Sequence, residues 1–260
     1  MATVETIPRL ASPISMNKSG LFGLIAAVLL FFPLLGVAQT PVVVELFTSE
    51  GCSSCPPADA VLMKLGHQGN SNGTELVLLG EHVDYWNYLG WTDRFSSPQF
   101  SQRQSAYGNA LHSSVYTPQM VIDGRTQFVG GDLSDAQSRI AEAAKDPKPA
   151  QVTLRWEGNN QLHVKVQLPP QARANVLLAT TEDGLTTAVA EGENGGRTLH
   201  HAAVVRQLRQ LGHPEKGVYE TTVDVVPQPN WNKANVKVAV LVQETGNMEI
   251  LGAASIPYAH

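Results

Sequence analysis

The sequence has few cysteines and no excess of positive charge. Cys52 and Cys55 are the only cysteines among 260 residues, so a disulfide-rich scaffold and a four-thiolate zinc site are excluded. Eighteen Lys and Arg stand against 23 Asp and Glu, a net charge of −5. A chain without basic excess is a poor nucleic-acid binder, because it cannot neutralise phosphates. The 43% hydrophobic content, with no repeats or low-complexity segments, predicts packed cores instead of disorder.

Long hydrophobic runs are also scarce, since residues 21–38 form the only one. This run is uncharged and ends with small residues at Gly36 and Ala38, which predicts a signal peptide over residues 1–38 that is cut after Ala38. An uncleaved membrane anchor is the alternative, because about 20 apolar residues span a bilayer. Pro33 favours cleavage. We therefore expect a periplasmic or secreted chain, free of the membrane after cleavage, in an oxidising compartment.

The first part of the mature chain, residues 39–147, alternates strand and helix patterns. β-branched runs predict strands, and Ser97-Pro98 has the cap and first-turn proline of a helix start. Asp123-Gly124 is typical of a hairpin turn. The predicted order is β-α-β-α-β-β-α, with strands at 42–47, 75–80, 119–122 and 126–129, and helices ending near 65, starting at 97 and starting near 134.

The pattern changes after the proline-rich stretch 146–149, which predicts a domain boundary there. Residues 150–260 hold several runs that alternate apolar and polar residues and are separated by turn signals. This spacing predicts a mostly-β, sandwich-like domain. Residues 198–211 fit a helix or a strand equally well and stay open. The expected fold is thus an α/β domain, a mixed sheet with flanking helices, followed by a β-rich domain.

The two cysteines form a Cys-x-x-Cys motif at the point where the first strand is expected to turn into a helix. Free amides and the dipole at a helix N-terminus lower a cysteine pKa from about 8.5 into the range of about 3.5 to 7.5. Cys52 is then the nucleophile, and Cys55 resolves the mixed disulfide. The motif alone is also compatible with half of a metal site or with an inert structural disulfide.

The stretch VYTPQMVIDG resembles the thioredoxin loop in which a cis proline faces the Cys-x-x-Cys pair, and the similarity to thioredoxin covers about residues 41–146. The resemblance implies that Cys52 and Cys55 are a redox pair. It also implies a cis bond before Pro118 and a role for the backbone of Thr117 in receiving a substrate chain. A cis bond before proline costs only about 0.5 to 1 kcal/mol.

Residues 45–59 and 82–91 look more specifically like a bacterial family of secreted thioredoxin-like proteins that is catalogued as a domain of unknown function. The similarity reaches residues 192–199 in the second domain. It implies a thioredoxin-like fold and an export route, and it supplies no established substrate.

The chain departs from thioredoxin at two places. Thioredoxins carry a buried Asp six residues before the first cysteine. Here this position is Leu46, and the acidic residue next to it, Glu45, lies seven residues before Cys52. Glu45 is either the proton acceptor of the thiols or a solvated carboxylate at a strand end. Pro56-Pro57 is the second departure, because it can delay the helix start and leave Cys52 less stabilised.

His82 and Asp84 end the second strand, where the carboxyl edge of a parallel sheet gathers functional groups, and they are candidates to shuttle protons there. With the two cysteines they form a candidate copper site, since thiolate and imidazole suit this metal. The favoured alternative is that they stabilise the strand end and the turn. The aromatic residues that follow, Tyr85, Trp86, Tyr88, Trp91 and Phe95, line a peptide groove or form a small core under the loop, the latter being favoured.

The leading hypothesis is thiol-disulfide exchange with protein thiols or disulfides in the periplasm. Cys52 and Cys55 carry the chemistry, Pro118 and Thr117 position the partner, and Glu45 is the candidate proton acceptor. No cofactor or resident metal is expected. The competing hypothesis is a non-enzymatic binding protein, which either handles copper through the two thiolates or uses the disulfide only to staple the fold.

Overall fold

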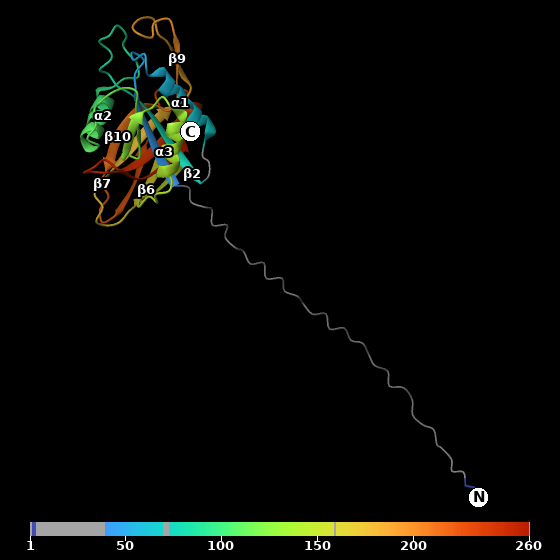
Figure 1. Ribbon diagram of the computed structural model, residues 1–260. Coiled ribbons are helices and arrows are strands. Elements are labelled where there is room, and N and C mark those ends of the chain that lie inside the picture. Colours follow the sequence, from blue (N-terminus) through green and yellow to red (C-terminus); the bar gives the residue numbers. More distant parts are fainter. Residues whose placement is uncertain (1, 4–39, 70–72, 159, 260) are drawn as a thin grey trace. The chain divides into compact units, whose positions relative to one another are not determined.

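The computed structural model describes residues 2–3, 40–69, 73–158 and 160–259 (Figure 1). The predicted signal peptide, residues 1–38, falls almost entirely outside this set. Among the described residues, no helix is both long enough and apolar enough to cross a membrane.

The first part of the chain has the predicted order of elements. Its bounds are β1 Thr40–Thr48, α1 Pro56–Gln68, β2 Thr74–His82, α2 Pro98–Ala110, β3 Gln119–Ile122, β4 Thr126–Val129 and α3 Leu133–Ala143. Ser97 caps α2, because its hydroxyl accepts a hydrogen bond from the amide of Gln99. The β3–β4 turn takes positive φ at Asp123 and Gly124, 50° and 65°, as a type I′ hairpin requires.

The second part is built from strands and short connections. Its bounds are β5 Gln151–Gly158, β6 Gln161–Gln167, β7 Ala174–Glu182, β8 Leu185–Ala188, β9 Thr198–His201, β10 Val204–Gly212, β11 Val218–Asp224, a 3₁₀ turn Lys233–Asn235, β12 Val236–Glu244 and β13 Ile250–Pro257. The ambiguous segment 198–211 is therefore two strands. Tertiary context decides it, since β10 pairs along most of its length with β7.

One sheet of eight strands runs through both parts, in the order β13-β12-β7-β10-β2-β1-β3-β4. β1 and β2 are parallel, as a β-α-β unit requires, and β3 returns antiparallel to β1. The connection between the two halves is β10, where Val204 pairs with Gly80 of β2. The boundary predicted at 147–150 stays a prediction, but the sheet is continuous across it.

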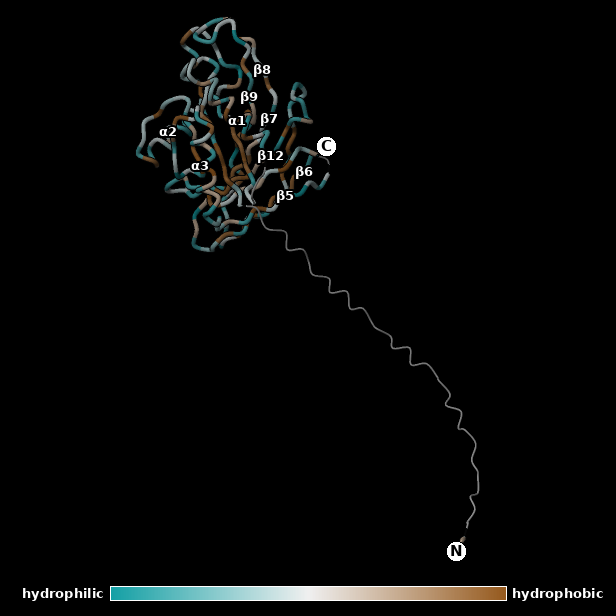
Figure 2. The backbone as a smooth tube through the Cα atoms, turned by 45° about the vertical axis from the view of Figure 1, so that its right-hand side comes forward, coloured by the Kyte–Doolittle hydropathy of each residue, from teal (hydrophilic) through white to brown (hydrophobic). Residues whose placement is uncertain are grey.

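The two faces of this sheet are covered differently. On one face, α1 and α3 pack against Val42, Val44 and Leu46 of β1, and a three-stranded sheet, β11-β6-β5, packs against β7 and β12. On the other face, Phe100 of α2 joins apolar side chains from β1, β2, β7, β10, β12 and β13. Figure 2 shows hydrophobic segments concentrated in the strands of the interior. The predicted class, a mixed α/β sheet followed by β-rich, sandwich-like structure, is confirmed.

Candidate functional site

The two cysteines are joined in a disulfide in the connection between β1 and α1. Cys52 and Cys55 have Cα atoms 5.4 Å apart. Cys55 is the N-cap of α1, and the helix begins at Pro56. The paired prolines therefore delay the helix, as the second departure from thioredoxin allowed. Cys52 lies before the first turn, so the helix N-terminus favours a thiolate at Cys55 more than at Cys52. At Cys52 the hydroxyl of Ser54 lies 3.3 Å from the sulfur.

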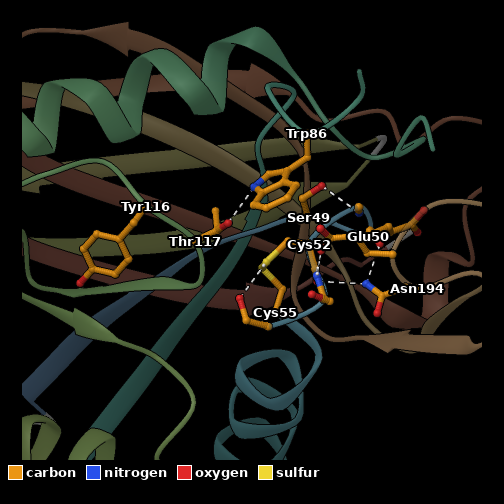
Figure 3. Close-up of a disulfide and its surroundings, with 12 residues drawn as sticks. Ser49, Glu50, Cys52, Cys55, Trp86, Tyr116, Thr117 and Asn194 are labelled. Carbon is orange, nitrogen blue, oxygen red and sulfur yellow. Dashed lines mark hydrogen bonds between the residues drawn. A yellow bond between two sulfur atoms is a disulfide. The ribbon is translucent and has the colours of Figure 1, made fainter. Parts of the chain in front are cut away.

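The disulfide is covered by segments that are distant in sequence. Both cysteines are 0% exposed. The indole N–H of Trp86 donates to the Thr117 hydroxyl at 2.8 Å, and Figure 3 shows Trp86 and Thr117 beside the sulfur atoms. Trp86 also packs closely on Gly51, where an added Cβ would lie 3.2 Å from the tryptophan Cβ. The sulfur atoms are thus closed off from solvent in this conformation.

A loop between β8 and β9, residues 189–197, fixes the backbone around Cys52. The side-chain amide of Asn194 donates to the carbonyl oxygens of Glu50 and Cys52, at 2.9 and 3.0 Å. The carboxylate of Glu193 accepts the amide N–H of Ser53 at 3.0 Å. Asn194 is 0% exposed, so this loop is packed onto the Cys-x-x-Cys segment (Figure 3).

The second loop expected at the site is in place. The Thr117–Pro118 bond is cis, in agreement with the thioredoxin resemblance. β3 follows directly, and its first residue, Gln119, pairs with Phe47 near the end of β1. Since β1 leads into the Cys-x-x-Cys segment, the sheet itself brings Thr117 and Pro118 to the disulfide.

Glu45 lies elsewhere. Its carboxylate is 0% exposed and accepts hydrogen bonds from Arg103 Nε at 2.6 Å and from the Tyr107 hydroxyl at 2.5 Å. These partners come from α2, which covers the sheet face opposite α1. The interpretation as a solvated carboxylate is wrong, because Glu45 sits inside a buried ion pair. Both oxygens are occupied by α2, which leaves no contact with a cysteine.

Glu81 of β2 is part of the same buried group and has an unusual titration. One of its oxygens lies 3.4 Å from Arg103 Nε, the guanidinium nitrogen that Glu45 also uses. Burial and the neighbouring charge of Glu45 raise the pKa of Glu81 well above its ordinary value. One cation thus faces two buried carboxyl groups, and Glu81 holds its proton more strongly than an exposed glutamate does.

A cluster of buried ionisable groups lies on the side of α1, and the sequence pointed to only one of its members, His82. His82 Nδ1 is 2.7 Å from Asp93 Oδ2, and Asp93 also accepts the amide of Glu50 at 2.9 Å. Burial acts to lower the pKa of His82, but the charge of Asp93 and its hydrogen bond outweigh burial and raise it. His82 therefore stays protonated, and paired with the Asp93 carboxylate, up to a higher pH than an exposed histidine would.

The cluster continues from Glu50 to β9. His201 Nε2 lies 3.3 Å from Glu50 Oε1, and the indole of Trp91 donates to the other oxygen of Glu50 at 2.8 Å. The rings of His82 and His201 have centroids 4.9 Å apart. All these groups except Trp91 are nearly inaccessible to solvent. Sequence spacing alone could not join them, since they come from four separate segments.

Asp59 completes the cluster from the first turn of α1. It is 6% exposed, and burial raises its pKa, while the nearby charges of His201 and His82 partly offset this effect. A signal for Asp59 was present in the sequence, because it lies four residues after Cys55 and so on the same side of a helix.

The candidate copper site is not assembled. Both thiols are in the disulfide, His82 is engaged by Asp93, and Asp84 accepts a hydrogen bond from the Ser101 hydroxyl at 2.5 Å. Within the described part of the chain, no group of three or more His, Cys, Asp or Glu is arranged to hold a metal ion.

The aromatic residues of the connection after β2 divide between two roles. Phe95 is 8% exposed and packs edge-on against His82 and His201. Tyr85 and Tyr88 are instead 38% and 87% exposed, and so is the neighbouring Leu89 at 55%. Part of the loop therefore forms a small core, as the favoured interpretation predicted, and part presents apolar surface close to Trp86.

The family of the chain follows from the comparisons. The model of a protein family of unknown function, DUF1223, matches residues 43–243, which include the disulfide, the Thr117–Pro118 loop and the 189–197 loop. The chain belongs to this family. No curated protein matches it.

Among solved structures, the chain is similar to the crystal structure of protein AGR_C_4864 from Agrobacterium tumefaciens. The identity is 28%, the TM-score is 0.67, and the match covers 84% of this chain and 94% of that chain. A domain of the outer membrane lipoprotein Omp28 from Porphyromonas gingivalis also matches, at 12% identity and a TM-score of 0.23, over 41% of this chain and 91% of that chain.

Proposed function

We propose that the chain is an exported, thioredoxin-like protein that exchanges its Cys52–Cys55 disulfide with protein thiols in the periplasm. The observation that carries the proposal is the disulfide between a strand and a helix N-terminus, with the Thr117–Pro118 loop beside it. The Cys52–Cys55 disulfide closes a loop of few residues, so it constrains the unfolded chain little and stabilises the fold little. A purely structural role therefore does not explain its placement.

The exchange balances without a cofactor. A thiolate of a partner dithiol attacks Cys52 Sγ, the sulfur–sulfur bond breaks, and Cys55 leaves as a thiolate. The second partner thiolate then attacks the partner's own sulfur in the mixed disulfide and releases Cys52. The partner loses two electrons and the Cys52–Cys55 pair gains them, and both cysteine thiolates take up a proton.

Attack at Cys52 requires its cover to open. Trp86 is held by one hydrogen bond to Thr117, and the 189–197 loop is held by Asn194 and Glu193. Exposed apolar residues, Tyr88 and Leu89, adjoin Trp86 in sequence and offer a protein partner a contact surface. A partner that binds there and displaces Trp86 gains access to the sulfur.

The test is a pair of single substitutions in the exported protein. In Cys55→Ser, the free Cys52 thiolate can still attack a partner disulfide, which is the reverse direction of the exchange, and one partner sulfur leaves as a thiolate. Cys55 is then missing to resolve the mixed disulfide, so partner adducts should accumulate and appear as reducible bands on non-reducing gels of periplasmic extract. Cys52→Ser is the matched control and should trap none. Equal behaviour of the two variants, without adducts, would leave a structural disulfide as the function of the pair.

A further inference from the structure

Reduction of the disulfide creates a problem inside the protein. The sulfur of Cys55 leaves as an anion, and Cys55 is 0% exposed. Burying a charge is costly, and the N-terminus of α1 offsets only part of this cost at Cys55, so a proton from a nearby group stabilises the sulfur further. Glu45 does not provide it, because its oxygens are occupied by Arg103 and Tyr107 on the other side of the sheet.

The geometry of α1 brings Asp59 to Cys55. The amide of Asp59 donates to the carbonyl of Cys55 at 3.1 Å, and Cys55 itself has helical dihedral angles, φ −77° and ψ −37°. The two residues are thus one helical turn apart, with Cβ atoms about 5 to 6 Å from each other. Side chains tilt toward the N-terminus of a helix, which directs the side chain of Asp59 toward the N-terminal turn of α1, where Cys55 lies.

Asp59 also has a route to solvent. A cavity of about 170 Å³ lies between α1 and β9, and Asp59 lines it together with Pro56, Met63, Leu199 and His200. A space of this size holds several water molecules, since one water occupies about 30 Å³. A proton lost by Asp59 to the site can therefore be replaced through this cavity while Cys55 stays covered.

The groups that face Asp59 have opposing effects on its pKa. Thr48 of β1, His201 of β9 and His82 of β2 favour its anion, and Asp93 disfavours it. Burial has the largest effect and raises its pKa. The resulting acid holds a proton at higher pH than an exposed aspartate, which is what a proton donor to a thiolate needs.

We propose that Asp59 donates a proton to the Cys55 thiolate when the disulfide is reduced and takes it back when the disulfide re-forms. This proposal rests on the proposed exchange function. On reduction, the proton moves from the carboxyl group of Asp59 to Cys55 Sγ, and solvent in the α1–β9 cavity reprotonates Asp59. On re-formation of the disulfide the steps reverse: Asp59 first releases its proton to this solvent and then accepts the proton of Cys55. The electrons come from the partner dithiol, so the step adds no further reactant.

The first experiment measures the reduction of the protein by dithiothreitol as a function of pH, corrected for the dithiothreitol thiolate. In the wild type the rate constant should fall as pH rises through the pKa of Asp59, because the ionised carboxylate can no longer donate a proton. The rate constant well below this pKa should exceed that well above it by roughly 10²-fold. Asp59→Asn should lose this inflection. The matched control is Glu81→Gln, which removes a buried carboxyl group with a raised pKa on the other face and should retain it.

The second experiment does not depend on exchange. In a Cys52→Ser background, Cys55 is the only thiol, and its pKa is read from thiolate absorbance. Asp59→Asn should lower this pKa by roughly one unit, because a neighbouring negative charge is removed, and Glu81→Gln should leave it unchanged. The trapping experiment with Cys55→Ser tests the exchange function separately. A Cys55 pKa that does not change in Asp59→Asn would therefore overturn the proposed role of Asp59 and would leave the exchange function untouched.

A third measurement needs no substitution and covers the case in which Asp59→Asn fails to fold. The carboxyl ¹³C signal of Asp59 is titrated in the oxidised and in the reduced wild-type protein. The pKa of Asp59 should differ between the two states, because Cys55 is a titrating neighbour only after reduction. Identical titrations would overturn the proposal.

Discussion

At the scale of single residues, the Cys52–Cys55 disulfide follows the end of β1, whereas the carboxylate of Glu45 is buried under α2. The spacing of Cys52 and Cys55 and the resemblance around Thr117-Pro118 indicated a pair and a loop that the structure brings together. Glu45 could not be placed, because a strand residue at position 45 faces either side of the sheet depending on register. Its partners Arg103 and Tyr107 lie about 60 residues along the chain, at separations of 58 and 62.

The buried carboxyl pair makes a prediction about stability and pH. The folded state holds the proton of Glu81 more strongly than the unfolded state, because burial and Glu45 raise its pKa. Stability from this group is therefore complete below the ordinary pKa of a glutamate and is lost as pH rises through the raised value. Glu81→Gln should remove this loss, so that the variant gains on the wild type with increasing pH, by up to about 1.4 kcal/mol per pH unit.

The measurement is urea unfolding of both proteins at several pH values between 5 and 9. The difference in unfolding free energy isolates Glu81, since the other titrating groups are shared. A difference that stays constant with pH would mean that Glu81 is ionised in the folded protein over the whole range.

At the scale of elements, the start of α1 and the secondary structure of residues 198–211 were not determined by the hydrophobic pattern of the sequence. The helix after the cysteines begins at Pro56 instead of Cys52 because proline fits the first turn, where its missing amide costs nothing. Residues 198–211 carry apolar positions that suit either period, and pairing with β7 selects the strand. The 189–197 loop had no predicted role at all, although the family resemblance touched it, because its partners are the backbone of Glu50, Cys52 and Ser53.

This loop should control access to the disulfide. Asn194→Ala removes two hydrogen bonds to backbone carbonyls, each with a net value of about 0.5 to 1.5 kcal/mol. Opening should become easier by about 1 to 3 kcal/mol, which corresponds to roughly 5- to 150-fold faster reduction by dithiothreitol when opening limits the rate. The control is Asn232→Ala, which removes the cap of the 3₁₀ turn at Lys233–Asn235 and should leave the rate unchanged. Equal rates for wild type and Asn194→Ala would show that the loop does not gate the sulfur atoms.

At the scale of the whole molecule, local patterns predicted which segments are strands and could not predict their order in a sheet. The proline-rich stretch 146–149 favoured two domains, yet the eight-stranded sheet continues through it. The reason is that β10 inserts beside β2 across 124 residues of sequence, with Val204 opposite Gly80. Gly80 is required there, because an added Cβ would lie 2.9 Å from the carbonyl of Ala202.

The core on the α2 face decides whether the two halves can fold apart. Val77 and Leu79 of the first half share this core with Leu177, Val205 and other residues of the second half. A fragment that ends at residue 147 would expose these side chains and the edge of β2, and burying each large apolar side chain is worth about 1.5 to 3 kcal/mol. We expect the fragment 40–147 to lack a cooperative unfolding transition by circular dichroism. The chain 40–260 should unfold in a single transition, coincident by tryptophan fluorescence and circular dichroism. A folded fragment, or two separate transitions in the longer chain, would instead establish the boundary at 147–150 as one between independent domains.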